Sequence, residues 1–463
     1  MSARSLRFIT AAVAIIVASS AFADMNSAGR AYKNGDYAGA FTQYKELAEL
    51  GAPQAQFNIA VMYANGQGVA ESNTYAHAWA SLAAQNGYSK GADLAGELQP
   101  LLTPTSLQLS ADIQAKYSQT ALNTRLLPRM LKDKEYDGRD PPKLSKPYIP
   151  EYPSDARSHG VQGDAYVEFT VAPDGHPRAP RILYAVPSNY FEDTIRMSVL
   201  RSVYLPGRVN GYPVATPTGM FFNFKMNEVS IHDYRGLEKQ VEDAKTKAEG
   251  GDPTAQMLYG MMLAGLPQLQ QSYTKALPWF LKAAQAGAPY AQFQVGTALL
   301  RGRGCQCESV KGEIWLEKAA QADEPNAQVS LAEYLLRENS SAESVAGALV
   351  WLERAVKQGN SAGQFLLASV LAASPDTNVR DPSRALKLAD AVQKDYKHDP
   401  SLWEIRAAAY ASLKDFSAAT KAQDHAIDSA ALLGWDLKSM QERRALYASM
   451  QPWTGNILDF QGY

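Results

Sequence analysis

The sequence predicts an α-helical solenoid of helix-turn-helix repeats that is interrupted by one small α+β domain. Three observations support this fold class: a fixed 36-residue period in the second half of the chain, a related unit near the N-terminus, and a period-two alternation of apolar residues between them. Periods of about 20 to 50 residues are typical of solenoids, whereas period-two alternation indicates strands. We therefore expect a central sheet domain flanked by helical repeats.

A glutamine and a tryptophan recur at fixed positions of the repeat. In the second half of the chain successive copies are 36 residues apart, and in both halves each tryptophan follows a glutamine by 23 residues. The glutamines are Gln56, Gln256, Gln292, Gln328 and Gln364, and the tryptophans are Trp79, Trp279, Trp315 and Trp351. We interpret both as packing residues, because a solenoid core needs large side chains at one helical phase. A ligand-stacking role for the tryptophans is the alternative.

Glycines mark the loops and helix ends of the repeat. Gly-x-Gly triplets occur at 66–68 and 302–304, each starting ten residues after a glutamine, while the copy after Gln256 has Ala-Gly-Leu-Pro instead. Together with the alanine-glutamine and tryptophan-alanine-alanine segments, this pattern resembles the Sel1-like subclass of tetratricopeptide repeats over residues 27–100 and 240–395. The resemblance implies a non-catalytic scaffold that binds proteins on a concave face.

A proline-rich segment separates the two repeat regions and opens the central domain. Residues 136–153 contain five prolines, which oppose helix and favour extended backbone. Strands are predicted at 164–171, around 182–186 and at 220–226, with a turn at 172–175 and a helix over 190–203. The predicted order is therefore strand, strand, helix, strand, and the helix covers one face of the sheet.

This central segment resembles the C-terminal domain of the TonB energy transducers. The matching motifs are Tyr152-Pro153, Gly160-Val161-Gln162-Gly163, Asp174-Gly175, Leu205-Pro206 and Gly211-Tyr212-Pro213-Val214. The resemblance implies an exposed strand edge on which a partner peptide adds as a further strand. The counterpart here comprises Gly219, Met220, Phe221, Phe222, Asn223, Phe224, Lys225 and Met226. The three phenylalanines of this stretch can pack both on the helix and on the incoming peptide. The alternative is that the edge is covered by a repeat array or by a second copy of the chain. Covering by a second copy would give a homodimer.

The chain departs from an energy transducer in ways that bear on function. It has no long proline-rich spacer, and its TonB-like segment lies between helical repeats. We therefore expect a binding module in a protein-protein interaction scaffold. An atypical TonB-family energy transducer, or an accessory of transport through outer-membrane receptors, is the alternative.

The N-terminus carries a predicted export signal. Arg4 and Arg7 precede an uncharged run that ends in Ala21-Phe22-Ala23, the small-x-small pattern cut by a signal peptidase before Asp24. We expect cleavage and a protein without an integral membrane segment in the periplasm of a Gram-negative bacterium. A retained membrane anchor is the alternative.

The predicted organisation follows from these features in chain order. The expected parts are a signal peptide at 1–23, Sel1-like repeats with a trailing helical segment at 24–135, a proline-rich linker at 136–150, a TonB-like domain at 145–228, a second Sel1-like array at 229–395, a tetratricopeptide-like capping hairpin at 396–450 and a tail at 451–463.

Composition and motifs argue against several functions. The chain has a net charge of −2, which gives no basic footprint for nucleic acid. The common catalytic and nucleotide-binding motifs are absent from the sequence, so we expect neither an enzyme nor a cofactor. The six histidines are never within four residues of one another, which argues against a local metal site.

Cys305 and Cys307 can form a strained local disulfide or remain thiols. A redox role is the alternative. The expected partners are other periplasmic or outer-membrane proteins.

Overall fold

The computed structural model describes residues 25–131, 139–225, 228–230, 238–265, 273–338 and 342–455. The predicted signal peptide, Met226 and most of the C-terminal tail lie outside these ranges. The chain divides into two compact units, the first comprising residues 1–49 and 53–114, and the second comprising 50–52 and 115–463. We describe each unit by itself.

The first unit is helical. It contains a predicted repeat hairpin, formed by α3 and α4, between two flanking helix pairs. The elements are α1 (Met25–Lys33), α2 (Tyr37–Glu49), α3 (Pro53–Asn65), α4 (Asn73–Gln85), α5 (Lys90–Leu98), a 3-10 turn η1 (Gln99–Leu101) and α6 (Pro104–Lys116). Ser72 begins α4 by accepting the backbone N–H of Tyr75, which satisfies one of the unpaired donors at a helix start.

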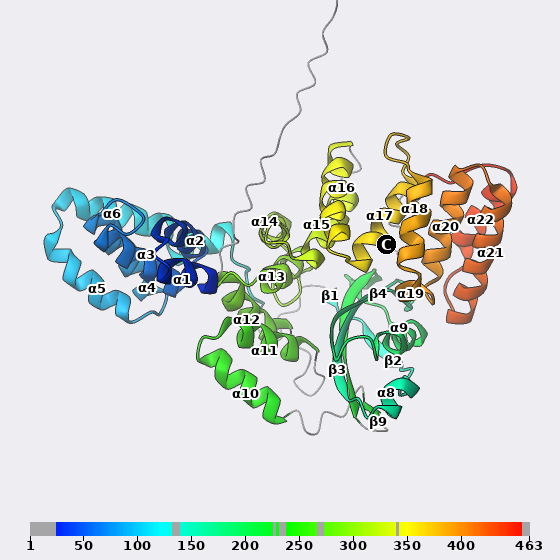
Figure 1. Cartoon of the computed structure of the whole chain (residues 1–463), viewed down its shortest axis with the longest axis horizontal. Coiled ribbons are helices and arrows are strands. Elements are labelled where there is room, and N and C mark those ends of the chain that lie inside the picture. The colour runs from blue at the N-terminus through cyan, green and yellow to red at the C-terminus, as the bar shows by residue number, and fades with distance from the viewer. Residues whose placement is uncertain are drawn as a thin grey trace, which may run out of the picture. The chain divides into compact units, whose positions relative to one another are not determined.

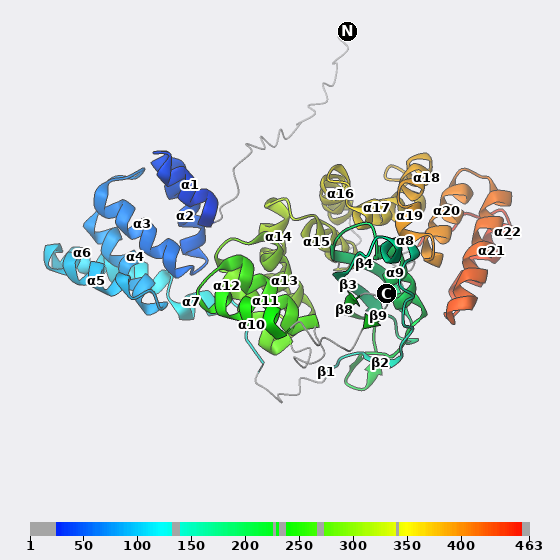
Figure 2. The same cartoon turned by 60° about the horizontal axis from the view of Figure 1, so that its bottom comes forward.

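The second unit contains the long repeat array (Figures 1 and 2). After α7 (Gln119–Arg125), the array runs through α10 (Glu238–Glu249), α11 (Pro253–Gly265), α12 (Tyr273–Gln285), α13 (Pro289–Arg301), α14 (Ser309–Gln321), α15 (Pro325–Glu338), α16 (Ala342–Lys357) and α17 (Ser361–Ala373). It ends in α18 (Pro382–Ala391), α19 (Gln393–Tyr396), α20 (Pro400–Ser412), α21 (Phe416–Leu433) and α22 (Lys438–Ala448). The C-terminal hairpin expected from the sequence is thus α20 and α21, followed by a third helix.

The repeat glutamines tie consecutive helices together. In four copies the side-chain Nε2 donates to a backbone carbonyl eight residues earlier, at the end of the preceding helix. The pairs are Gln56 with Ala48, Gln256 with Ala248, Gln292 with Ala284 and Gln328 with Ala320, at 3.1 to 3.2 Å. The last carbonyls of a helix lack an amide partner within the helix, and the glutamine supplies a side-chain donor to each. The carbonyls of Ala248, Ala284 and Ala320 also accept the backbone N–H three residues later, at 3.0 to 3.2 Å. A buried polar side chain at this position is therefore a helix-capping group.

The Gly-x-Gly loops allow a close backbone approach. Gly302 and Gly304 have φ values of 64° and 76°, which favour glycine. A Cβ on Gly304 would lie 2.6 Å from the backbone of Tyr273, the first residue of α12. Both requirements explain why glycine occupies the end of this triplet.

The central sheet is antiparallel, with strand order β4-β3-β8-β9. Its strands are β3 (Gly163–Val171), β4 (Pro177–Val186), β8 (Thr216–Lys225) and β9 (Glu228–Ser230), and the covering helix is α9 (Glu192–Arg201). Smaller elements surround it: β1 (Arg139–Asp140), β2 (Lys143–Lys146), α8 (Ser154–Ser158), β5 (Val203–Leu205), β6 (Arg208–Val209) and β7 (Tyr212–Pro213).

The predicted order strand, strand, helix, strand is confirmed, and the fold is a mostly helical repeat with a small inserted sheet. Two strands are longer than predicted. β4 begins at Pro177 rather than near Ile182, and β8 begins at Thr216 rather than Met220. Apolar alternation is absent from the added stretches, which contain Arg178, Pro180 and Pro217. In these stretches the strands pair through their backbones, although the sequence lacks the apolar alternation that would indicate a strand.

Candidate protein-binding site at the faces and edges of the central sheet

The sheet is covered on both faces. Ala165, Val167 and Phe169 of β3 pack with Phe222 and Phe224 of β8 in the core that includes α9. Figures 1 and 2 show α9 on one side of the sheet and α11 to α15 on the other. One-sided covering, as the sequence suggests, would leave the alternate residues of β3 exposed to solvent. The array covers them instead.

The second face of β3 is polar but buried. Tyr166, Glu168 and Thr170 alternate with the apolar residues and are only 2, 4 and 6% exposed. Tyr166 packs against Gly265 at the end of α11, where an added Cβ would lie 2.8 Å from the ring. The missing side chain at Gly265 thus gives the sheet room to dock on the array.

An arginine of a repeat loop contacts this polar face. Arg303, the middle residue of the second Gly-x-Gly triplet, places its Nη2 3.8 Å from Glu168 Oε1, and its Cζ lies 4.1 Å from the Tyr273 ring centroid. Arg181 of β4 places its Nη2 3.6 Å from Glu168 Oε2. A buried carboxylate needs such compensation. The triplet therefore also supplies a contact between the array and the sheet.

Three tyrosines surround this ion cluster as neutral groups. Burial raises the pKa of Tyr166, Tyr273 and Tyr290, with the Coulombic effect of nearby Glu168 adding to the rise. A raised phenol pKa keeps the hydroxyl protonated at neutral pH. The tyrosines consequently serve as packing and hydrogen-bonding groups here; Tyr273, for example, donates to Gln294 at 3.3 Å.

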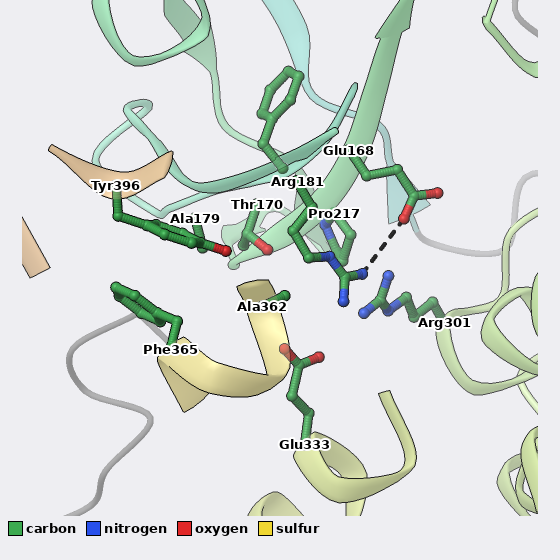
Figure 3. Close-up of a pocket in the computed structure, with 11 residues that line it drawn as sticks. Glu168, Thr170, Ala179, Arg181, Pro217, Arg301, Glu333, Ala362, Phe365 and Tyr396 are labelled. Atoms are coloured by element: carbon green, nitrogen blue, oxygen red, sulfur yellow. Dashed lines mark ion pairs between the residues drawn. The ribbon is translucent and has the colours of Figure 1, made fainter. Parts of the chain in front are cut away.

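A small cavity remains between the sheet and the array. It has a volume of about 30 Å³ and is lined by Glu168, Arg181, Arg301, Glu333, Phe365 and Tyr396, among others. Figure 3 shows the carboxylate of Glu168 directed at Arg181, with Arg301 beside it and Glu333 across the cavity. Water needs roughly 10 to 15 Å³ of such space. The cavity therefore suits one or two waters and is too small for an organic ligand.

The C-terminal helices also hold the sheet domain. Arg178 of β4 pairs with Asp174 at 2.7 Å and stacks over Trp435, with its Cζ 3.5 Å from the ring centroid. Leu200 of α9 packs in a cluster with Ala430, Trp435 and Met440. Desolvation raises the pKa of Asp174, but the His176 hydrogen bond and the Arg178 charge more than reverse this and lower it below its usual value. The carboxyl group of Asp174, in the turn after β3, is therefore ionised at neutral pH.

The sequence-predicted strand edge lies in β8 and is occupied along part of its length. Asn223, Phe224 and Lys225 pair with β9, so that β9 covers the outer side of these three residues. Phe222 and Phe224 pack on the α9 side, whereas Phe221 packs against Ala244 and Met262 of the array. The expectation that all three aromatics serve the helix and an incoming peptide is wrong for Phe221. Between Thr216 and Phe222, β8 pairs with β3 alone among the described strands.

The repeat tryptophans differ in burial. Trp315 is fully buried and Trp79 is 3% exposed, while Trp279 and Trp351 are partly buried. Trp315 Nε1 donates to the carbonyl of Leu126 at 2.8 Å, just beyond α7. Trp279 and Trp351 stack with Lys282 and Arg354 of their own helices, at 4.3 and 5.0 Å. Gln364 is also partly buried, and its backbone N–H donates to the carbonyl of Asn360 at 3.0 Å.

Cys305 and Cys307 are not joined by a disulfide. Cys305 is fully buried and forms a short antiparallel bridge with Met130, while exposed Cys307 donates to the carbonyl of Leu300 at 3.2 Å. The neighbouring backbone pairs Gln306 N–H with the Arg129 carbonyl at 2.9 Å. The cysteine loop therefore receives the chain segment after α7. Sequence reasoning missed this contact because neither segment carries a distinctive pattern.

Within the described ranges, no group of three His, Cys, Asp or Glu side chains could hold a metal ion. Among the helices in those same ranges, none combines the length and hydrophobicity that a bilayer crossing requires.

Comparison with known families identifies two kinds of domain. The "Gram-negative bacterial TonB protein C-terminal" family matches residues 149–226, and the Sel1 repeat family matches residues 53–88, 253–287, 289–324 and 325–360. Neither is a catalytic family. The chain is a Sel1 repeat protein with a TonB C-terminal domain, as the motifs predicted.

Individual relatives match only in part. The chain is 34% identical to protein TonB of Klebsiella pneumoniae over 83 residues, which cover 18% of this chain and 32% of that protein. It is 37% identical to protein TonB of Escherichia coli strain K12 over 59 residues, 13% of this chain and 25% of that protein. The chain thus spans a third or less of these relatives.

Solved structures of repeat proteins are similar over larger shares of the chain but with low scores. A Sel1 repeat protein from Oxalobacter formigenes matches 47% of this chain and 94% of its own, with 21% identity and a TM-score of 0.35. A Sel1 repeat protein from Klebsiella pneumoniae matches 45% and 99%, with 19% identity and a TM-score of 0.30. The protective antigen c5321 of uropathogenic Escherichia coli matches 94% and 83%, with 15% identity and a TM-score of 0.28.

Proposed function

We propose that this chain is a non-catalytic periplasmic scaffold that binds other envelope proteins through its helical repeats and through strand addition to its TonB-like sheet. The TonB C-terminal match at 149–226 carries this proposal, because that family is the protein-binding part of a Gram-negative envelope protein. The Sel1 matches support a scaffold role, since stacked repeats provide extended binding surfaces. The predicted signal peptide supports the periplasmic location.

The binding surfaces differ between the two repeat regions. In the second unit, part of the array is used internally, because its loops and helices contact Tyr166, Glu168 and Phe221 of the sheet. The repeats of the first unit have aromatic side chains at partly exposed positions, including Tyr37 and Tyr75, each 38% exposed. We propose that envelope proteins bind these repeats and the open part of the sheet.

Strand addition is proposed on the outer side of β8, the edge at 219–226 that the sequence indicates. β9 already pairs with Asn223 to Lys225, so the proposed acceptor is the stretch from Thr216 to Met220, which pairs with β3 on its other side. An edge strand exposes backbone N–H and C=O groups that an extended peptide can pair with. Partner side chains would then contact the flanking surface rather than Phe222, which is fully buried.

Affinity capture with matched variants tests this function. The mature protein, cross-linked in whole cells, should recover specific envelope proteins identified by mass spectrometry. Proline removes a backbone donor, so Met220→Pro should abolish sheet-dependent capture. Met220→Ala shortens the same side chain but keeps the donor, and it should retain capture. Capture that survives Met220→Pro in folded protein would move binding to the repeats.

The alternative function is an atypical energy transducer or an accessory of outer-membrane receptor transport. Its support is the 34% identity to protein TonB over 83 residues. A retained N-terminal anchor and co-purification with a proton-driven inner-membrane complex would favour it. Release of the protein by osmotic shock, with Asp24 as its first residue, would favour the scaffold.

A further inference from the structure

The outer side of β4 is the other edge of the sheet, and its two halves differ. In the first half, Arg178 is bound to Asp174 and Trp435, the backbone of Ala179 is hydrogen-bonded to Asp399, and Pro180 has no amide hydrogen. In the second half, residues 182–186 pair with β3 on one side. No other described strand pairs with them, and no backbone bond to another described element is present there.

A groove lies along this second half of β4. It has a volume of about 470 Å³, and its lining includes Ile182, Ala185, Tyr190, Asp193, Arg196 and Lys394. These residues come from β4, the loop before α9, α9 itself and α19, so the edge is flanked by helices. Val186, at the end of β4, is 53% exposed. An added strand lies about 4.8 Å from its neighbour. A recessed edge therefore admits a single extended chain more readily than it admits the whole sheet of a second copy.

Among the described charges around the groove, one cation is without a carboxylate partner. Arg196 pairs with Asp395 at 3.3 Å, and Lys397 pairs with Asp193 at 2.9 Å. Glu192 accepts the backbone N–H groups of Asn189 and Phe191, at 2.7 and 3.1 Å. Lys394 on α19 is exposed, and no described carboxylate lies within ion-pair distance of it. A partner carboxylate would complement this site.

We infer that residues 182–186 of β4 form a second strand-acceptor site, which takes an extended partner segment that carries an acidic residue opposite Lys394. The inference rests on the proposed scaffold function and extends it to an edge that the TonB resemblance does not indicate. Backbone pairing with β4 supplies the affinity, and the carboxylate sets the register of the bound segment. The bulge of β4 at Leu183, where the pairing with β3 shifts by one residue, limits the regular acceptor stretch to about its last three residues.

A defined peptide tests the site on the intact mature chain. The probe is a fluorescein-labelled, acetylated and amidated hexapeptide, Thr-Val-Asp-Val-Thr-Val, whose binding is measured by fluorescence anisotropy. Hydrogen exchange with mass spectrometry then locates the protected amides. We expect protection centred on 184–186, and binding about tenfold weaker in Lys394→Glu, as for the loss of roughly 1.4 kcal/mol. Lys387→Glu, an equivalent change at an exposed lysine of α18 outside the groove, is the matched control.

Each outcome is decisive for this edge. Replacing the aspartate of the probe by lysine should weaken binding to the native chain and restore it in Lys394→Glu. Protection at 216–222 alone would overturn the β4 inference while supporting the proposed function at β8. No protection at either edge overturns the inference, and capture of envelope proteins then decides the proposed function separately. A concentration-dependent dimer that Lys394→Glu dissociates would show that a second copy occupies the edge, which also overturns it.

Discussion

The two faces of β3 are buried by different chemistry. One face packs Val167 and Phe169 against α9 in an apolar core. The other places Tyr166 and Glu168 against the repeat array, where Arg303 compensates the buried carboxylate. Apolar packing tolerates small shifts, whereas a buried charge requires a specific partner. The comparison indicates that α9 stabilises the sheet, and that the polar face fixes its position on the array.

The largest expected effect comes from the apolar face. Phe222 is fully buried and contacts the α9 core, so Phe222→Ala should lower the free energy of unfolding by about 3 to 5 kcal/mol. Phe221→Ala, on the array side, should cost less because that ring is only partly buried. Chemical denaturation measures both. Equal losses would mean that the two faces contribute alike.

Trp315 allows a fully buried repeat tryptophan to be compared with a partly buried one in the same array. Trp315→Ala removes a fully buried ring and its bond to the Leu126 carbonyl, so we expect a loss of about 3 to 5 kcal/mol and faster exchange of the amides near α7. Trp351→Ala, at a partly buried equivalent position, is the control and should cost less. An unchanged melting temperature for Trp315→Ala would contradict the packing role and reopen ligand stacking.

The polar face is tested through its ion cluster. Glu168→Gln keeps the shape of the side chain but leaves Arg303 and Arg181 without their carboxylate, at an expected cost of about 3 kcal/mol. The double variant Glu168→Gln, Arg303→Gln should lose less stability than the sum of the two single variants, because it removes both charges of the buried pair and leaves neither without its partner. Additive losses in denaturation experiments would show that the two side chains act independently.

The smallest expected effect concerns pH. The pKa of Asp174 is lowered in the folded chain, so its contribution is present above its unfolded pKa and is lost as pH falls toward the folded pKa. Asp174→Asn should therefore cost about 1 kcal/mol at pH 7, with the difference from the native chain shrinking below about pH 4. Stability measured by denaturation from pH 7 to 3 gives the curve. A difference that stays constant to pH 3 would contradict the assignment.

Much of the fold was predictable because it is periodic. The 36-residue spacing of glutamines and tryptophans indicates the repeats, and the alternation from Ala165 to Val171 indicates β3. The docking of the sheet on the array was not predictable, since Glu168 and Arg303 lie in unrelated patterns 135 residues apart. The available signals for this docking were a charged residue inside an apolar strand and an arginine between two loop glycines. The β4 groove gave none, because its lining comes from three separate elements.

Native-state hydrogen exchange tests the central claim most directly, namely that the sheet is a fixed part of the array. Exchange of β3 and of α11 to α15 is measured by mass spectrometry at increasing low denaturant concentration. We predict that both regions open with the same free energy and the same denaturant dependence, and that Glu168→Gln lowers the opening free energy of both. Separate opening of β3, with the array amides still protected, would contradict the claim and show a sheet domain that folds independently of the repeats.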